Sequence, residues 1–141
     1  MQAVLVDQLR KANRRITVQR MQVFEGVKGL DSHPSALEVF EAVKPRLPSI
    51  SLATVYRNLH ILRLEGLLRE IHCDRGITRF DSNLSEHYHF HCTSCQRVSD
   101  VPSYSREIER SFSEKTGLHI SGHHLTFQGL CNDCLKVEPS R

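Results

Sequence analysis

The chain has 141 residues, of which 25% are charged and 39% hydrophobic, and its formal net charge is +3. No apolar run is as long as a membrane span and the N-terminus lacks the layout of a signal peptide, so we expect a soluble, cytoplasmic protein. The length allows one ordinary domain or two small ones, and a small domain needs a metal ion or a partner chain for stability.

Three helices are predicted before residue 50. Apolar residues at helical spacing indicate the first two, and Thr17 is a suitable N-cap for the second. Those apolar residues are Val4, Leu5, Leu9 and Ala12, then Met21, Phe24 and Val27. Ser35 to Glu38 has the S-x-x-E form of a capping box for a third helix. The residues expected to face inward from it are Leu37, Phe40 and Val43.

A fourth helix is predicted from Ser51 to Gly66, followed by strands at 67–73 and 77–81 that a turn connects. Small, polar or basic side chains form its outward face, namely Ser51, Thr54, Arg57 and Asn58. Helices followed by a hairpin have the order of a winged helix-turn-helix, in which one helix enters the DNA major groove. An ordinary surface helix has the same pattern, but a basic run in the same half favours DNA. The run comprises Arg10, Lys11, Arg14, Arg15 and Arg20.

The second half is predicted to be rich in β-structure. Strands are expected at 88–92 and 97–101, followed by a helix at about 103–116 and a long strand within 118–130. The apolar stripe expected on the helix consists of Tyr104, Ile108 and Phe112. A long terminal strand suits a sheet that is shared across a dimer.

Four cysteines form two C-x-x-C pairs, Cys92 with Cys95 and Cys131 with Cys134. A gap of two residues lets both thiolates of a pair bind one Zn²⁺ at about 2.3 Å, and four thiolates leave no open position for catalysis. Disulfides or a redox-active pair are the alternatives, but nothing indicates export or a thioredoxin-like βαβ unit. We therefore expect structural zinc, and the fifth cysteine, Cys73, is expected to be a small structural side chain.

The fold class is therefore α+β. A winged helix-turn-helix DNA-binding domain is expected at residues 1–83. A C-terminal α/β dimerisation domain with structural zinc is expected at residues 84–141, where the polar stretch after residue 81 separates the basic half from the Cys/His half.

A second group of donors carries no thiolate. His87 and His89 are two residues apart on a predicted strand, so both imidazoles point to one face. Asp81 ends the hairpin and Asp100 lies near the end of the next strand. Nitrogen and oxygen donors of this mix suit Mn²⁺, Fe²⁺ or Zn²⁺, although a pair of surface histidines is common without a metal.

The chain resembles the ferric uptake regulator superfamily from about residue 14 to residue 134. The matching segments are Thr17-Val-Gln-Arg20, His33-Pro-Ser-Ala36, Ser51-Leu-Ala-Thr-Val-Tyr-Arg-Asn-Leu59, Arg79-Phe-Asp81, His87-Tyr-His-Phe-His-Cys-Thr-Ser-Cys95 and Cys131-Asn-Asp-Cys134. The resemblance implies a metal-dependent transcriptional repressor that acts as a homodimer on an A/T-rich inverted repeat of double-stranded DNA.

The resemblance also implies roles for individual residues. His33 would join Asp81, His87, His89 and Asp100 in a regulatory Fe²⁺ or Mn²⁺ site. Tyr56 and Arg57 would contact bases, with Ser51, Thr54 and Asn58 near phosphates or base edges. Arg15 is similar in position to a basic residue that reaches the minor groove.

An aspartate at position 100 is similar to the peroxide-sensing branch of the superfamily, whereas iron-responsive members generally have glutamate there. That branch releases DNA when H₂O₂ oxidises a ligand histidine, which would be His33 or His87 here. Iron-responsive or zinc-responsive repression on the same scaffold is the alternative. More remote are a metalloenzyme, for which no H-E-x-x-H motif is present, and a zinc-stapled interaction module without a DNA role.

A further metal site of iron sensors has possible counterparts in Glu86, Glu107 and His123. Tyr88 stands where that site has an aspartate ligand, so we expect the site not to be filled. His91, His119 and His124 match no ligand position and are expected to be surface or sheet residues.

Overall fold

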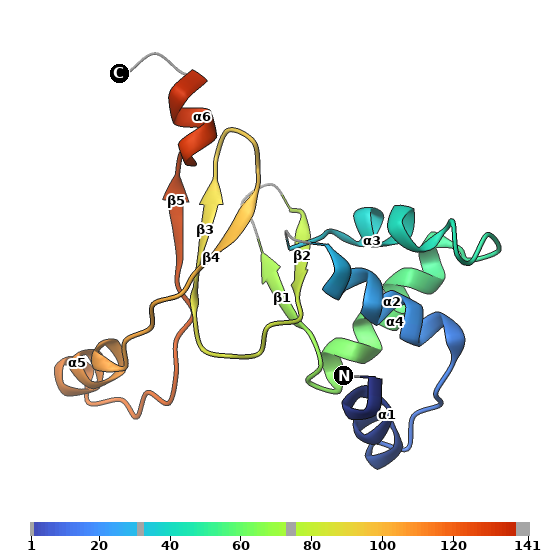
Figure 1. Ribbon diagram of the computed structural model, residues 1–141. Coiled ribbons are helices and arrows are strands. Elements are labelled where there is room, and N and C mark those ends of the chain that lie inside the picture. The colour runs from blue at the N-terminus through green and yellow to red at the C-terminus, as the bar shows by residue number, and fades with distance from the viewer. Residues whose placement is uncertain (1, 31–32, 73–75, 138–141) are drawn as a thin grey trace. The chain divides into compact units, whose positions relative to one another are not determined.

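The computed structural model describes residues 2–30, 33–72 and 76–137, and the chain divides into two compact units, Met1–Leu84 and Ser85–Arg141 (Figure 1). Cys73 and the first two residues of the predicted turn, Asp74 and Arg75, lie outside the described residues. Among the helices of the described ranges, none combines the length and the apolar character that crossing a membrane requires.

The N-terminal unit contains four helices followed by an antiparallel hairpin. The elements are α1 (Gln2–Lys11), α2 (Val18–Gly29), α3 (Ala36–Val43), α4 (Leu52–Leu64), β1 (Arg69–His72) and β2 (Thr78–Asp81). This is the winged helix-turn-helix order that the sequence predicts, with α4 as the helix that precedes the hairpin.

Side-chain caps begin three of these helices where the sequence predicts them. The hydroxyl of Thr17 accepts a hydrogen bond from the backbone N–H of Arg20 at 3.1 Å, and Ser51 caps α4 in the same way. Ser35 and Glu38 form a complete capping box at α3. These bonds satisfy N–H groups that the first turn of a helix leaves without an intrahelical partner.

One apolar cluster holds the N-terminal unit together, and α1 to α4 and β2 all contribute to it. Its members include Leu5, Leu9, Val23, Phe24, Val27, Ala36, Val39, Val43, Val55, Leu59, Leu62 and Phe80. Gly26 lets α2 approach α3, because a Cβ atom there would lie 2.9 Å from Val43 Cγ2. The expectation that Leu37 faces inward is wrong, because it is 51% exposed, whereas Phe40 and Val43 do pack in or against the apolar cluster as expected. Ala36 and Val39 are also buried there.

The C-terminal unit is built on a three-stranded sheet with the order β4-β3-β5. Its elements are β3 (Tyr88–Cys92), β4 (Val98–Val101), α5 (Glu107–Thr116), β5 (Thr126–Gly129) and α6 (Asn132–Val137). Strand β4 runs antiparallel to β3, whereas β5 runs parallel to it. The predicted long strand is wrong, because only 126–129 are extended in the sheet, and α6 was not expected.

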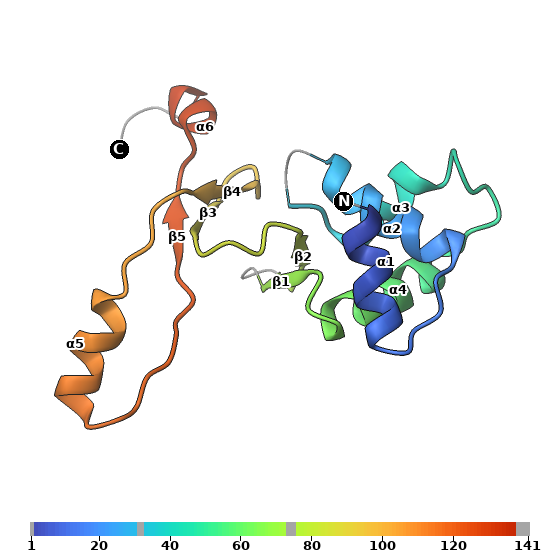
Figure 2. The same cartoon turned by 60° about the horizontal axis from the view of Figure 1, so that its bottom comes forward.

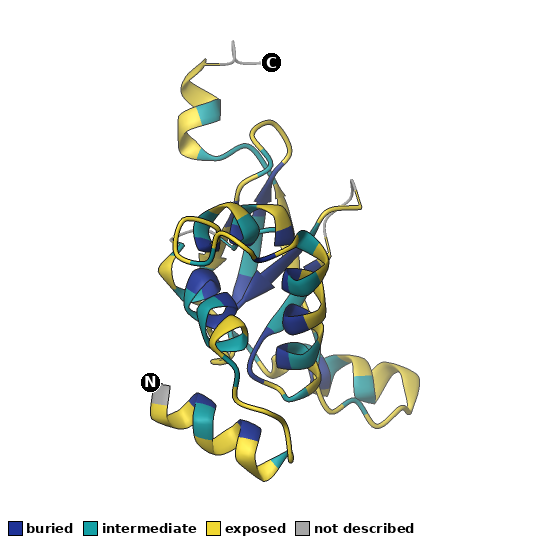
Figure 3. Ribbon diagram, turned by 90° about the vertical axis from the view of Figure 1, so that its right-hand side faces the viewer, coloured by how far each residue is buried: buried dark blue, intermediate teal, exposed yellow. Residues whose placement is uncertain are grey.

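Helix α5 lies on the excursion between β4 and β5, away from the sheet (Figure 2). Of the apolar stripe expected on it, Tyr104 and Ile108 are half-buried and Phe112 is 51% exposed, while the residue that α5 buries is Glu109. Several large apolar side chains of this unit are also exposed: Leu118, Phe127, Leu135 and Val137. Figure 3 shows the contrast between the exposed α5 and α6 and the buried inner faces of the N-terminal helices.

Candidate metal centres and nucleic-acid interface

The four cysteines of the two C-x-x-C pairs lie together in the C-terminal unit. Cys92 ends β3, Cys95 follows in the next turn, and Cys131 and Cys134 lie just before and within α6. All four sulfur atoms lie within 4.8 Å of one another, and Cys95 Sγ and Cys131 Sγ are 3.9 Å apart. Zinc–sulfur bonds of about 2.3 Å place tetrahedral ligands about 3.8 Å apart, so this cluster fits a structural zinc ion.

The local backbone prepares one of these thiols for a metal. N–H groups of Cys131 and Cys95 stabilise the Cys92 thiolate and lower its pKa to about 6. The Cys131 N–H lies 3.4 Å from Cys92 Sγ. A hydrogen bond with Cys131 raises the pKa of the Cys134 thiol, so zinc binding must displace the proton of Cys134.

The N-terminal unit holds two of the predicted regulatory donors close together. His33 Nδ1 lies 3.5 Å from Asp81 Oδ1. The segment that carries His33 is bound to β2, because Arg79 donates to the His33 carbonyl at 2.8 Å and the Phe80 N–H donates to Pro34 at 2.9 Å. Strand β2 then presents Asp81 at its end, where the side chain is 2% exposed.

The C-terminal unit holds the other three predicted donors. His87 immediately precedes β3 and His89 lies on it, and the Nε2 atoms of the two imidazoles are 3.0 Å apart. Asp100 pairs with His89 across β3 and β4, and its Oδ1 lies 3.2 Å from His87 Nε2. The Nδ1 atom of His87 lies 2.7 Å from the Ser85 carbonyl, which fixes the ring with Nε2 toward His89 and Asp100.

Among the described residues, those considered for a further metal site do not form a cluster of metal donors. Glu86 pairs with Arg106, and Glu107 pairs with Arg110 on the next turn of α5. His123 Nδ1 instead lies 2.9 Å from Glu109, a residue that sequence reasoning missed.

Aromatic hydroxyls complete the cluster around His123. Tyr88 Oη lies 2.9 Å from His123 Nε2, and Tyr104 donates to Glu109 at 3.2 Å. Burial favours the neutral acid of Glu109, but hydrogen bonds from His123, the backbone and Tyr104 outweigh it and lower the pKa of this carboxyl. A hydrogen-bonded cluster thus occupies this part of the unit. No sequence pattern could have identified Glu109, because its partners lie five residues before it and fourteen residues after it.

Most of the residues predicted to contact DNA are accessible on the N-terminal unit. Tyr56 is 56% exposed, and Arg57, Ser51 and Arg15 are also exposed. Thr54 is half-buried and bonds to both Ser51 and Arg57. These residues lie along α4 and just before α2.

The expectation that Asn58 faces outward is wrong, because its side chain is buried. Its amide donates to the Thr54 carbonyl at 2.9 Å, and its oxygen accepts from Arg20 Nε at 3.1 Å. The same guanidinium donates to the backbone carbonyl of Arg15. Asn58 and Arg20 therefore join α4 to the segment that carries Arg15.

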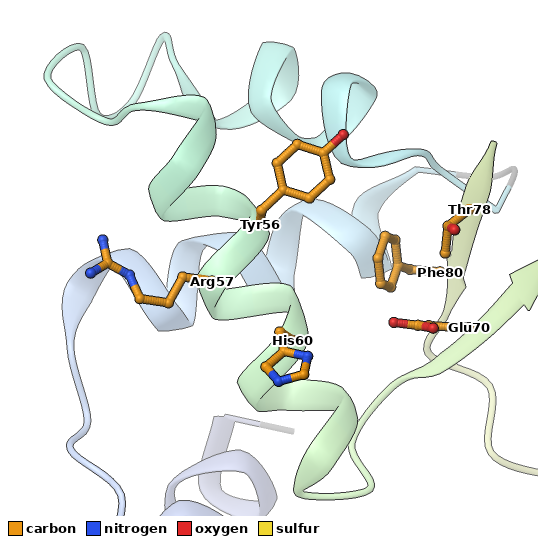
Figure 4. Close-up of a pocket in the computed structure, with 6 residues that line it drawn as sticks. All are labelled: Tyr56, Arg57, His60, Glu70, Thr78 and Phe80. Carbon is orange, nitrogen blue, oxygen red and sulfur yellow. The ribbon is translucent and has the colours of Figure 1, made fainter. Parts of the chain in front are cut away.

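A cavity of about 430 Å³ lies between α4 and the hairpin. Figure 4 shows Tyr56 and His60 on the α4 side and Glu70, Thr78 and Phe80 on the hairpin side, while Arg57 extends away from the hairpin. Arg63 bonds to Glu70 at 2.9 Å, which links the end of α4 to β1.

Three arginine side chains lie close enough to influence one another beside α4. Burial lowers the pKa of Arg20, and the positive charges of Arg14 and Arg57 lower it further.

Comparisons with known proteins agree with these features. The sequence profile of the ferric uptake regulator family matches residues 11–128. The peroxide operon regulator of Bacillus subtilis (strain 168) is 34% identical over 135 residues, which cover 94% of this chain and 92% of that protein. The peroxide-responsive repressor PerR of Staphylococcus epidermidis is also 34% identical, over 92% of this chain and 87% of that protein.

Two solved structures have a similar fold. The peroxide stress regulator of Campylobacter jejuni superposes with a TM-score of 0.71 at 30% identity, over 95% of this chain and 98% of that one. The Helicobacter pylori ferric uptake regulator, whose structure has three functional metal-binding sites, gives a TM-score of 0.78 at 21% identity, over 94% and 90%. The profile match and the extent of the similarity show that this chain belongs to the ferric uptake regulator family.

Proposed function

We propose that this protein is a metal-dependent, DNA-binding transcriptional repressor that responds to peroxide. The observation that carries the proposal is a set of thiolate-free His and Asp donors, two in the N-terminal unit and three in the C-terminal unit, that is distinct from the Cys₄ cluster. A closed thiolate site serves structure, whereas imidazole and carboxylate donors suit an exchangeable Fe²⁺ or Mn²⁺ ion. The relatives named peroxide operon regulator and peroxide-responsive repressor PerR support the same function.

Double-stranded DNA is the proposed partner of α4. Tyr56 and Arg57 are exposed on consecutive positions of this helix, where they can reach base edges in the major groove. Ser51 and Thr54 lie at its first turn, where a phosphate would meet the N–H groups of the helix start. Arg15 is proposed to enter the minor groove, held in place by the bond from Arg20 to its carbonyl.

His33, Asp81, His87, His89 and Asp100 are the proposed ligands of the regulatory ion. Two come from the N-terminal unit and three from the C-terminal unit, so an ion that all five bind would fix one unit against the other. In a two-fold dimer this would set the spacing of two α4 helices to that of two half-sites. By linkage, metal would then tighten DNA binding and DNA would tighten metal binding by the same factor.

A homodimer on an inverted repeat rich in A and T is the proposed assembly. The C-terminal unit has little buried apolar surface, and β5 lies at one edge of its sheet with Phe127 47% exposed. An exposed strand edge with an apolar side chain is suited to a partner chain. Two identical subunits related by a two-fold axis read a palindromic site.

Peroxide is proposed to act on a ligand histidine, either His33 or His87. Bound Fe²⁺ supplies the reactivity toward H₂O₂ that the side chains lack. In the net reaction one imidazole C–H becomes C–OH and the peroxide is reduced to one molecule of water. An oxidised imidazole donates less well to the metal, so the ion and then the DNA are released.

The test is operator binding by protein loaded with Fe²⁺ or with Mn²⁺, before and after a brief anaerobic dose of stoichiometric H₂O₂. Intact mass is measured in parallel. We expect only the Fe²⁺ form to release DNA and to gain one oxygen atom. If both forms keep their DNA at unchanged mass, the peroxide proposal fails and an iron-responsive or zinc-responsive repressor is the better explanation.

A regulatory role also differs from a catalytic one in stoichiometry. We propose that the protein is not an enzyme, so that oxidation occurs once per site and then stops. Continued consumption of H₂O₂ or of another small substrate over many turnovers would contradict this and favour a metalloenzyme.

A further inference from the structure

The turn after β3 contains a residue in an unusual backbone conformation. Gln96 has φ +65°, and Asn13 is the only other non-glycine residue with positive φ in the described ranges. Crowding of Cβ against the following carbonyl disfavours this region for every residue except glycine. Some other contact must therefore hold Gln96 in place.

His91 supplies that contact from within the sheet. Its side chain is buried, with 2% of the residue exposed, and its Nε2 lies 2.9 Å from Gln96 Oε1. The amide nitrogen of Gln96 donates to the Thr93 carbonyl at 2.8 Å, which fixes the amide oxygen toward His91. His91 therefore donates from Nε2, and both ends of the Gln96 side chain are bonded.

The same turn carries two of the zinc ligands. The Gln96 N–H donates to the Cys92 carbonyl at 2.9 Å, and the Cys92 N–H donates to Arg97 at 2.9 Å. These bonds close the turn around Cys95 at both ends. The backbone conformation of Gln96 is thus part of the closure of the turn that carries Cys92 and Cys95.

We propose that His91 and Gln96 are positioning residues for the structural zinc, and that the bond between them determines how slowly zinc is released. The proposal rests on the assignment of the Cys₄ cluster to zinc. Neither residue is a ligand, and the expectation that His91 is simply a surface or sheet residue misses this contact. Because the C-terminal unit has little apolar core, slow zinc release would also set the lifetime of the folded unit.

The experiment measures the rate at which full-length, zinc-loaded protein transfers zinc to a chromophoric chelator. His91→Leu removes the donor while keeping an apolar side chain in the buried position. We expect zinc release to become about five- to tenfold faster, the change that loss of one buried hydrogen bond predicts. Zinc from the Cys₄ site is identified as the slow phase of transfer that is absent from the Cys131→Ser variant.

A matched pair of double variants isolates the turn. His91→Leu with Gln96→Gly places a residue there that adopts positive φ without help, and zinc release should return to within about twofold of the wild-type rate. His91→Leu with Gln96→Ala differs by a single Cβ and should release zinc at least as fast as His91→Leu alone. Equal rates for the two double variants would overturn the proposal, as would a wild-type rate for His91→Leu.

Single variants at Gln96 repeat the comparison if the His91→Leu protein does not fold. Gln96→Ala should then release zinc faster than Gln96→Gly, and the opposite order would overturn the proposal. Zinc analysis of the purified wild-type protein tests the assignment of the Cys₄ cluster separately. If the cysteines of that protein hold no zinc, the assignment itself is overturned.

Discussion

Asn58 lies on the predicted DNA-reading helix, yet its side chain is bonded inside the N-terminal unit. It accepts a hydrogen bond from Arg20 and donates one to the Thr54 carbonyl. Asn58→Ala would leave the Arg20 Nε–H without its partner, so we expect the free energy of unfolding to fall by about 1–3 kcal/mol. Urea denaturation of the wild-type and variant proteins measures this loss.

The matched control is Arg57→Ala, which changes the preceding residue of the same helix. Arg57 is exposed, so its removal should leave stability nearly unchanged. Operator affinity should fall by about 1–3 kcal/mol and sequence preference should relax. If Arg57→Ala weakened binding equally on operator and random DNA, Arg57 would not read bases, and an unchanged stability for Asn58→Ala would refute its internal role.

Glu109 gives the C-terminal unit a dependence on pH. Hydrogen bonds lower its pKa below the ordinary value of 4.5, so the ionised form is bound more tightly in the folded state. Its contribution to stability is present above pH 4.5 and is lost as the pH falls through that value toward the lowered one. We expect the stability difference between wild type and Glu109→Gln to shrink over this range.

Thermal unfolding of both proteins at a series of pH values measures the difference. Acid protonates the zinc ligands of both proteins alike. The quantity compared is therefore the difference in stability between the two proteins at each pH, because either curve alone would also report the loss of zinc. A gap that stays constant from pH 6 to pH 3 would mean that folding does not shift the pKa of Glu109.

At the level of elements, local signals predict the start of a helix better than the face it buries. Thr17, Ser35 and Ser51 cap their helices as predicted, because capping depends on residues only three positions apart. Spacing alone places Leu37 on the inner face of α3, but its neighbours Ala36 and Val39 are the ones buried in the apolar cluster. A short helix with apolar residues on several sides does not specify which side is buried.

Contacts between distant segments explain the other differences. An alternating pattern within 118–130 predicted one long strand, but only 126–129 pair with β3. The cluster of Glu109, Tyr88 and His123 joins α5, β3 and the segment before β5, and no spacing in the sequence reveals it. The cysteine pairs were predictable, by contrast, because the C-x-x-C spacing itself reflects the geometry of one metal ion.

Ser51 combines two roles that substitutions can separate. It caps α4, and it also lies where a DNA phosphate is proposed to approach. Ser51→Asp retains an N-cap and suits the positive end of the helix, so stability should stay within about 0.5 kcal/mol of wild type. The added negative charge should weaken operator binding at least about tenfold, as measured by fluorescence anisotropy.

Ser51→Ala is the complementary variant. Loss of the cap should cost about 1 kcal/mol of stability, with a smaller effect on DNA binding. If Ser51→Asp bound the operator as tightly as wild type, α4 would not present its first turn to a phosphate.

For the whole molecule, the two units differ in what stabilises them. The N-terminal unit has its own apolar cluster, whereas the C-terminal unit relies on the Cys₄ cluster. A structural zinc site contributes about 10–16 kcal/mol, which is more than a small domain retains. We therefore expect zinc removal to unfold residues 85–141 and to leave the N-terminal unit folded.

Amide NMR spectra before and after zinc removal measure this directly, with sedimentation as a test of assembly. Signals from α2 to α4 should persist while those from β3 to α6 collapse, and the dimer should dissociate. Simultaneous loss of both sets of signals would mean that the units do not fold independently.

Independent folding of the N-terminal unit has a consequence for avidity. A linked pair of DNA readers binds its second half-site as an intramolecular event, at an effective concentration set by the linkage, and gains about 10²–10⁴-fold in apparent affinity. A chain that has lost zinc would still present an intact N-terminal unit with Tyr56 and Arg57 exposed on α4. It would occupy a single half-site too briefly to block transcription, so repression would end through loss of valency while each reading surface stayed unchanged.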